Sequence, residues 1–264
     1  MRRIEIEELK DLQINILDTV HKCCKKNNIN YWLDCGTLLG AIRHKGYIPW
    51  DDDIDVGMLR SDYEKFRKIF NIENERYVFM CPEDNNDFCY PHGKVLDTRT
   101  LLYEPDRQGR KIAVNIDIFV YDNAPKNERI LKRMYRMRDF YRGCNVARSQ
   151  RKDNIPGIKR KIGFLLLKIL LRPFPRNYFA RKISDNSKKY ANTITGRVGN
   201  FTSYSKFICE SSVFESFVDC MFENKLYSVP KGYDKWLRAF YGDYMKLPPV
   251  EKRVSSHKFE AYMI

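Results

Sequence analysis

One short segment of the sequence holds the acidic residues best placed to do chemistry. Four aspartates lie within five positions of one another: Asp51, Asp52, Asp53 and Asp55. If this segment is a strand, successive side chains point to opposite faces, so Asp51, Asp53 and Asp55 share one face and Ile54 and Val56 the other. Carboxylates this close repel one another, and a bound hard cation with oxygen ligands relieves the repulsion. The spacing therefore predicts a metal site, with Mg²⁺ as the expected ion and Mn²⁺ as its alternative.

A further acid that could complete this site lies much later in the chain. Residues 111–121 alternate as a strand does, and Asp117 is the single acid among their apolar side chains. Because a lone carboxylate on a buried strand needs a partner, we expect an adjacent strand to bring Asp117 beside Asp53 and Asp55. These three residues are the expected metal ligands, and Asp51 is expected as a further ligand or a supporting group. The alternative is a solvated acidic loop.

Groups that could bind phosphate precede the acids. Gly36 and Thr37 lie between an expected strand at 29–35 and a short helix, where backbone N–H groups and the positive end of the helix dipole can cradle a phosphate. Arg43 could clamp a phosphate, and Lys94 could add a second positive charge; both could also be ordinary surface residues. A cation beside bound phosphate suits phosphoryl transfer from a nucleotide.

Hydrophobic patterning predicts the elements that position these groups. Apolar residues recur at helical spacing over 4–28, and Ser61 with Glu64 has the spacing of a capping box, which predicts a helix opening at Ser61. Alternating residues predict strands at 52–59, 77–81, 94–96 and 111–121. His44 and His92 are expected to be ordinary surface or turn histidines. With no internal repeat and no low-complexity linker, the sequence predicts one α+β domain.

The positive charge of the chain is localised. The formal net charge is +14, and residues 129–189 hold 19 Lys and Arg against 3 acids, a difference of +16. Such a segment predicts an anionic partner surface. Within it, residues 157–174 are too short to span a bilayer, and Lys161, Lys168 and Arg172 form one stripe of a predicted helix. We expect this helix to lie in an anionic membrane interface; a buried helix with basic ends is the alternative.

The cysteines indicate a reducing compartment. The chain has eight of them, without a C-x-x-C pair or the Cys and His spacing of a zinc site. We expect reduced thiols in a cytosol, with a disulfide set as the alternative because the number is even. The N-terminal residues are charged, unlike a signal peptide, so a cytoplasmic protein is expected.

Three segments together resemble a known family. The residues GTLLGAIRHKGYIPWDDDIDVG, then NIDIF, and finally YGDYMKLPP followed by Arg253 and His257 are similar to the LicD/fukutin family of nucleotidyltransferase-fold phosphotransferases. The resemblance covers nearly the whole chain. It implies a nucleotidyltransferase-type mixed β-sheet core flanked by helices at about 24–125, a basic helical segment at about 126–195, and an aromatic-rich C-terminal region at about 196–264, all in one catalytic domain over 1–264.

The resemblance also implies an activity. Family roles carried over by position give nucleotide phosphate binding to Gly36 and Thr37, and Mg²⁺ binding to Asp53, Asp55 and Asp117. The implied reaction moves phosphocholine from CDP-choline, or another phospho-alcohol from a related CDP-alcohol, onto a hydroxyl of a lipid-linked cell-surface glycan, as in lipopolysaccharide or teichoic acid precursors, and releases CMP. Such an enzyme would work in the cytoplasm, peripherally associated with the inner face of the cell membrane.

Three other functions stay open at this point. A metal-dependent glycosyltransferase also uses a D-x-D motif, but it would release a nucleoside diphosphate. A basic nucleic-acid-binding protein would use the positive segment, although the apolar centre of that segment suits lipid better, so no nucleic acid is expected. A silent scaffold for glycan precursors would have no need for so much carboxylate repulsion.

Overall fold

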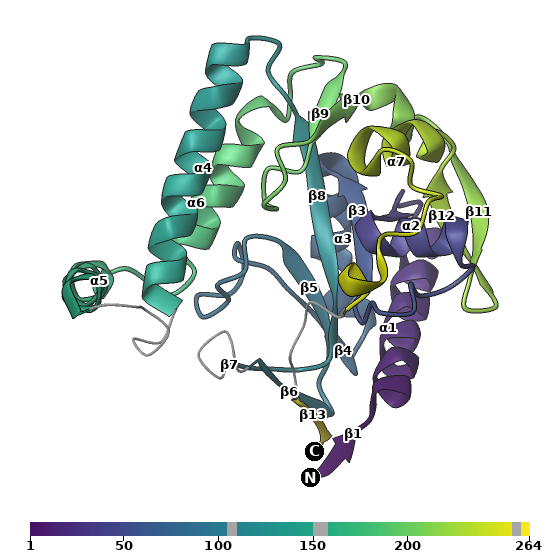
Figure 1. Ribbon diagram of the computed structural model, residues 1–264, viewed down its shortest axis with the longest axis horizontal. Helices are drawn as coiled ribbons and strands as arrows, with labels where there is room; N and C mark the ends of the chain where they lie inside the picture. Colours follow the sequence, from purple (N-terminus) through teal and green to yellow (C-terminus); the bar gives the residue numbers. More distant parts are fainter. Residues whose placement is uncertain (105–109, 150–157, 255–259) are drawn as a thin grey trace.

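The computed structural model describes residues 1–104, 110–149, 158–254 and 260–264 (Figure 1). The helices are α1 (Ile6–Lys26), α2 (Cys35–Arg43), α3 (Arg60–Glu73), α4 (Glu128–Ser149), α5 (Ile158–Leu171), α6 (Tyr178–Ser187) and α7 (Tyr233–Tyr241), with 3₁₀ turns η3 (Lys188–Tyr190), η4 (Ser211–Phe214) and η5 (Val250–Lys252). The strands are β1 (Arg2–Ile4), β2 (Trp32–Leu33), β3 (Asp55–Leu59), β4 (Tyr77–Met80), β5 (Gly93–Asp97), β6 (Thr100–Glu104), β7 (Arg110–Ile112), β8 (Asn115–Asn123), β9 (Arg197–Gly199), β10 (Ile208–Glu210), β11 (Phe217–Phe222), β12 (Lys225–Pro230) and β13 (Glu260–Met263).

A mixed sheet built around β8 organises the molecule. One edge of β8 pairs in parallel with β3, which in turn pairs with β2. The other edge pairs antiparallel with β5 along its first half and with β9 at its end, and β4 and β10 extend these two branches. Apart from the parallel pairing of β3 with β8, the strand pairs described in this sheet are antiparallel, so the fold is α+β, as the hydrophobic patterning predicts.

Apolar alternation decides which face of this sheet is covered. Val56, Val95 and Ile118 are completely buried on one face. α1 and α3 pack against β3, β5 and β8 (Figure 1), and the ring of Phe66 on α3 lies 5.1 Å from that of Phe79 on β4. Because side chains alternate along a strand, the polar neighbours of these apolar residues fall on the opposite face.

A smaller sheet joins the two ends of the chain. β1 and β13 pair antiparallel, with Arg2 opposite Met263, and β6 and β7 continue this sheet. The termini therefore lie side by side in Figure 1. The hairpin of β11 and β12 turns at Glu223 and Asn224, whose φ values of 47° and 61° fit a two-residue turn of the type that matches strand twist.

The basic segment is helical, as predicted. It forms α4, α5 and α6, of which α4 and α6 pack side by side while α5 stands at the outer edge of the molecule (Figure 1). Among the described residues, no helix combines the length and the apolar character needed to cross a bilayer. The eight cysteines all lie in the described ranges, and each is free.

Two predicted strands differ from the observed ones. The strand expected over 52–59 begins only at Asp55, because Asp51, Asp52 and Asp53 belong to the loop that leads into β3. The strand expected over 111–121 is divided: β7 joins the small sheet, β8 joins the large one, and the chain changes sheet between them. Alternation along a sequence shows an extended chain but not which sheet it joins.

The capping box predicted at Ser61 is wrong. α3 begins at Arg60, and Leu59 precedes it without a side-chain cap. Glu64 instead accepts hydrogen bonds from Arg60 at 3.2 Å and from Arg67 at 2.9 Å. With two guanidinium partners within one helical turn, the Glu64 carboxylate is drawn away from the N-terminal amides.

Candidate active site

Asp55 and Asp117 lie opposite each other across the parallel strands β3 and β8. Paired residues on neighbouring strands present their side chains to the same face, so both carboxyl groups lie on the face that α1 and α3 leave uncovered. Burial raises the pKa of Asp55 well above its usual range, and the nearby charges of Asp53 and Asp117 raise it further. The pair is thus a site of concentrated negative charge in a desolvated setting.

The sheet also supplies Asp117 with positive partners. Lys94 pairs with Asp117 in the register of β5 and β8, its ammonium contacts Asp117 Oδ1, and it donates to Asn115 Oδ1 at 2.9 Å. His92 Nε2 lies 3.1 Å from Asp117 Oδ2. Burial alone would raise the pKa of Asp117, but Lys94 and His92 outweigh it and hold that pKa well below its usual range. Asp117 is therefore kept ionised while Asp55 favours its proton.

Three more carboxylates meet in the loop before β3. One carboxylate oxygen from each of Asp51, Asp52 and Asp53 lies within 4.8 Å of the others. The loop is held from α1, where Gln13 Nε2 donates to the backbone oxygen of Asp52 at 3.0 Å. The strand argument for Asp51 and Asp53 is therefore incorrect, because neither residue belongs to β3, and the loop also brings in Asp52, which strand alternation places on the other face.

The Gly36 and Thr37 pair lies in the first turn of α2 and not in a turn before it, because this helix already begins at Cys35. Thr37 Oγ1 accepts a hydrogen bond from the backbone N–H of Asp55 at 2.8 Å, and Asp34 donates its N–H to the backbone oxygen of Asp55 at 2.9 Å. The N-terminus of α2 is thereby fastened to the start of β3, beside the acids.

Gly36 lies close to the acidic loop. A Cβ atom at this position would come within 2.7 Å of Asp51 Oδ2, so only glycine allows the Asp51 carboxylate its present place. Beneath the same turn, Asp34 is completely buried and accepts hydrogen bonds from the hydroxyl of Tyr121 at 3.0 and 2.9 Å. Burial raises the pKa of Asp34 to about 6, and the Tyr121 hydroxyl limits that rise. Helix, acidic loop and sheet meet at this point.

Arg43, at the last turn of α2, ties the C-terminal region to the site. Its Nη1 donates to the backbone oxygen of Tyr244 at 2.8 Å, and its Nε to His44 Nε2 at 2.9 Å. Burial raises the pKa of the Tyr241 phenol, and among the charges that add to this rise are those of Asp55 and Asp51, so the phenol lies near the acids while 39% of the residue is exposed.

The remaining cation of the C-terminal block, Arg253, lies 5.7 Å from the ring of Trp50. His257 lies outside the described residues. Sequence reasoning missed His92, Asn115 and Tyr241 as site residues. Asn115 could have been found from its alternation with Asp117, but His92 carries no local signal because it reaches the acids only through the pairing of β5 with β8.

The donor set fits a hard divalent cation. Asp53, Asp55 and Asp117 supply carboxylate oxygens only, and nitrogen or sulfur ligands are not needed to complete such a set. Burial is the main cause of the raised pKa of Asp55, and the neighbouring carboxylates add to it, so a bound cation would favour the ionised form of Asp55. The arrangement can hold Mg²⁺ beside the amides of α2, which is a site able to bind a nucleotide diphosphate.

Comparison with known proteins is consistent with this geometry. Residues 28–141 match a family model described as LicD/FKTN/FKRP, nucleotidyltransferase domain. The lipopolysaccharide cholinephosphotransferase LicD of Haemophilus influenzae is 33% identical over 270 residues, which cover 100% of both chains. An uncharacterised protein of Rickettsia typhi is 37% identical over 113 residues, 39% of this chain and 37% of that one. Human ribitol 5-phosphate transferase FKRP is 53% identical over 34 residues, 13% of this chain and 7% of that one.

Proposed function

Because the chain belongs to the LicD family and is therefore a transferase of phosphorus-containing groups, we propose that it transfers phosphocholine from CDP-choline to a hydroxyl of a lipid-linked cell-surface glycan. The acceptor oxygen forms a bond to the phosphorus that bears choline, the bond from that phosphorus to CMP breaks, and the hydroxyl proton passes to a carboxylate. A lipopolysaccharide precursor is the first acceptor to test, since the full-length relative is named for that substrate, and a teichoic acid precursor is the second.

The observation that carries this proposal is the pairing of Asp55 with Asp117 next to the acidic loop. Asp53, Asp55 and Asp117 would hold Mg²⁺, or Mn²⁺ in its place, and the ion would neutralise phosphate charge and stabilise the leaving oxygen. The parallel strands β3 and β8, which carry Asp55 and Asp117, lie beside the N-terminus of α2 near Gly36. This arrangement also supports a nucleotidyltransferase-type core.

The residues of the chain would bind and orient the donor. Backbone amides at Gly36 and Thr37 face the phosphates, as helix N-termini commonly do. Lys94 holds Asp117 ionised and in place, and its charge lies close to where the diphosphate would sit. Arg43 orders the C-terminal segment that carries Tyr241 over the acids. Asp51, fixed against Gly36, supports the ion or the attacking hydroxyl.

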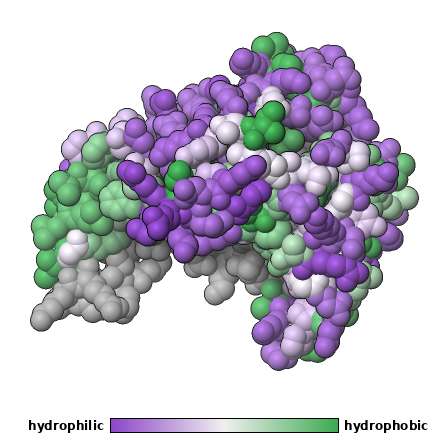
Figure 2. Space-filling model, turned by 90° about the horizontal axis from the view of Figure 1, so that it is seen from above, coloured by the Kyte–Doolittle hydropathy of each residue, from purple (hydrophilic) through white to green (hydrophobic). Residues whose placement is uncertain are grey.

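The surface of α5 supports a peripheral location at the inner face of the cell membrane. Leu166 and Leu170 are 62% and 70% exposed, and Ile162, Ile169 and Phe174 are exposed beside them. Figure 2 shows this apolar surface at the end of the molecule where α5 lies. An exposed apolar helix face among many Lys and Arg residues suits the interface of an anionic bilayer, where a lipid-linked acceptor would also be found.

A thermal-shift panel with product analysis tests the proposal. We expect CDP-choline, CDP-glycerol or CDP-ribitol with Mg²⁺ to raise the melting temperature more than UDP-sugars or ATP, because a ligand stabilises the state that binds it. With the acceptor added, CMP should be released and phosphate should move to the glycan. Release of a nucleoside diphosphate from a sugar nucleotide would instead identify a glycosyltransferase and contradict the proposal.

A further inference from the structure

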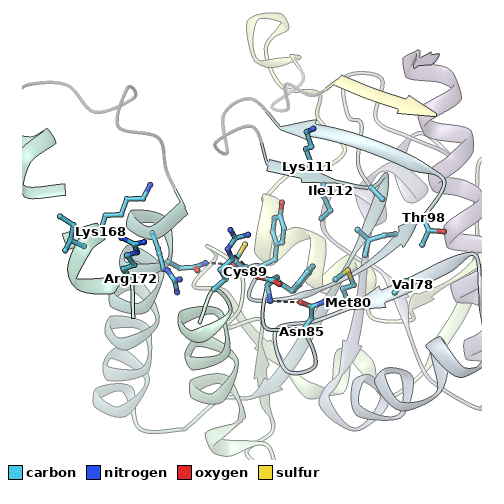
Figure 3. A pocket seen from close by; sticks show the side chains of 18 residues that line it. Val78, Met80, Asn85, Cys89, Thr98, Lys111, Ile112, Lys168 and Arg172 are labelled. Carbon is cyan, nitrogen blue, oxygen red and sulfur yellow. Dashed lines mark hydrogen bonds and ion pairs between the residues drawn. The ribbon is translucent and has the colours of Figure 1, made fainter. Parts of the chain in front are cut away.

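A large cavity lies beside the acidic site. Its volume is about 1120 Å³, and it is lined by strands β4, β5 and β7, the loop that contains Phe88 and Tyr90, the end of α4, and α5. Figure 3 shows Lys168 of α5 and Arg172, which directly follows this helix, on one side, Lys111 and Ile112 of β7 on the other, and Cys89 between them. The cavity is larger than most sites for a single small molecule and can accept several sugar units.

Strand register places this cavity on the same face of the sheet as the acids. Asp55, Asp117, Lys94 and Met80 form one row across β3, β8, β5 and β4, since each is paired with the next. Met80 lines the cavity. Paired residues share a face, and neighbouring strands are spaced by about 4.8 Å. Met80, two strands away, therefore lies about 10 Å from Asp117.

Two short chains of contacts connect residues that line the cavity with Asp117. The Lys94 ammonium that contacts Asp117 lies 4.7 Å from the ring centre of Tyr90, which lines the cavity. Ala113, another lining residue, accepts a hydrogen bond from Asn115 Nδ2 at 2.8 Å, and Asn115 Oδ1 in turn accepts from Lys94. A molecule in the cavity would therefore contact Tyr90 and Ala113, the immediate neighbours of the side chains that hold Asp117.

The lining suits an anionic saccharide. Among the described residues, five basic side chains contribute to it against the single acid Asp87: Lys111, Arg148, Lys168, Arg172 and Arg176. Val78, Met80 and Leu96 supply an apolar floor on the strands. Guanidinium and ammonium groups bind phosphate and carboxylate strongly, and the flat apolar faces of sugars pack on such a floor.

The two faces of α5 also link the cavity to a membrane. Lys168 lines the cavity, whereas Leu166 and Leu170, each about half a helical turn from it, are exposed to solvent. Lys168 of this helix therefore turns toward the protein, while the two leucines stay available to lipid.

Resting on the proposed function, we infer that this cavity is the acceptor subsite, which binds the phosphate- or carboxylate-bearing sugars of the acceptor while its lipid stays at the bilayer beside α5. The acceptor hydroxyl would then approach the donor phosphorus across Tyr90 and Lys94. The cavity and the acids are separate places on one sheet face, so binding of the saccharide can be measured without donor.

The test compares two double variants with equal loss of charge. Lys168→Gln with Arg172→Gln removes two cations from the cavity, and Lys22→Gln with Lys68→Gln removes two exposed cations that do not line it. The probe is the soluble oligosaccharide of lipopolysaccharide after de-O-acylation, used with and without phosphatase treatment. We expect the Kd of the untreated probe to be about tenfold or more higher for the cavity variant than for wild type. The control variant should have a Kd near that of wild type. Wild-type protein should bind the phosphatase-treated probe more weakly than the untreated probe.

The outcomes separate this inference from the proposed function. An equal Kd for the two double variants, or no binding of the untreated probe to wild-type protein, would overturn the acceptor subsite. Failure of wild-type protein to release CMP from every CDP-alcohol would instead overturn the donor chemistry. Melting temperatures of both variants within a few degrees of wild type show that the cavity variant is folded, and a thermal shift with CDP-choline and Mg²⁺ as in wild type shows that its donor site is intact.

Discussion

Asp55 and Asp117 face each other across two parallel strands, but their surroundings shift the pKa values of the two carboxyl groups in opposite directions. Burial raises the pKa of Asp55, and the charge of Asp53 adds to the rise. Lys94 and His92 overcome the same burial effect at Asp117 and lower its pKa. Asp117 is therefore ionised in the folded protein, whereas Asp55 would ionise fully only with a cation bound beside it.

This asymmetry predicts opposite effects on stability for two similar substitutions. Asp55→Asn removes repulsion and a costly buried charge, so the melting temperature without metal should stay equal or rise. Asp117→Asn leaves Lys94 and His92 without their carboxylate partner and should cost roughly 2–3 kcal/mol of unfolding free energy. Both variants should lose CMP release by at least about a thousandfold if the pair holds the ion.

The measurements are denaturant unfolding without metal and CMP release with Mg²⁺. Asp11→Asn is the matched control, because Asp11 is exposed on α1, and its unfolding free energy should stay within about 0.5 kcal/mol of wild type. Near-normal CMP release by Asp55→Asn would refute the metal assignment. Equal destabilisation by both site variants would refute the asymmetry.

The close approach of Asp51 to Gly36 predicts that substitution of Gly36 weakens metal binding with little change in the free energy of unfolding. In Gly36→Ala, the new methyl group would push away the Asp51 carboxylate, whose Oδ2 would lie only 2.7 Å from it. We expect the affinity for Mg²⁺ to fall by about tenfold or more, since groups that support metal ligands commonly have effects of this size. Titration of Mg²⁺ by calorimetry measures the change.

The control for this substitution is Gly143→Ala on α4. A Cβ atom there meets nothing within 4 Å, so alanine should stabilise the helix by roughly 0.5–1 kcal/mol and leave Mg²⁺ binding unchanged. If Gly36→Ala bound Mg²⁺ as tightly as Gly143→Ala, then the position of Asp51 would have no part in holding the ion.

The raised pKa of Asp34 predicts that the free energy of unfolding depends on pH. Its pKa is raised to about 6 by burial, so the folded state holds this proton more tightly than the unfolded state does. Its contribution is complete below the unfolded pKa of about 4 and is lost as pH rises through about 6, with a total of the order of 3 kcal/mol.

The measurement is the metal-free unfolding free energy from pH 4 to 7 for wild type and Asp34→Asn. The wild-type value should fall more steeply with increasing pH than that of the variant, because the amide side chain of the variant does not titrate. Asp55 contributes with the same sign in both proteins, and because the charge of Asp34 adds to the raised pKa of Asp55, the variant also lowers this second contribution. Parallel curves for the two proteins would show that Asp34 has an ordinary pKa.

The apolar face of α5 predicts binding to anionic membranes. Leu166→Ser with Leu170→Ser should weaken binding to vesicles that contain anionic lipid by at least about tenfold, because each leucine loses its transfer energy into the bilayer. Flotation of the protein with anionic and neutral vesicles at several salt concentrations measures this, and binding by wild type should weaken as salt increases.

Two exposed apolar residues elsewhere provide the control. Ile194→Ser with Val250→Ser removes side chains that are 98% and 72% exposed, and this variant should float as wild type does. Flotation of wild-type protein with neutral and anionic vesicles to the same extent would contradict a membrane role for the basic segment.

The sequence by itself determined which residues face which way along β8. The alternation around Asp117 placed its apolar neighbours Ile116 and Ile118 in the core, and the structure agrees because alternation is a local property of an extended chain. The helical spacing of α1 and of the basic segment was equally local. The types of the site residues, and the oxygen-only donor set they imply, were also present in the sequence.

Only the tertiary structure decided how these faces meet. The register of β3 with β8 puts Asp55 opposite Asp117, and that of β5 with β8 brings Lys94 to the same place. Strand register depends on contacts between segments distant in sequence, so local patterns cannot supply it. The loop geometry of Asp51 and Asp53 and the position of Lys168 at the cavity were decided in the same way, because each depends on packing against another part of the chain.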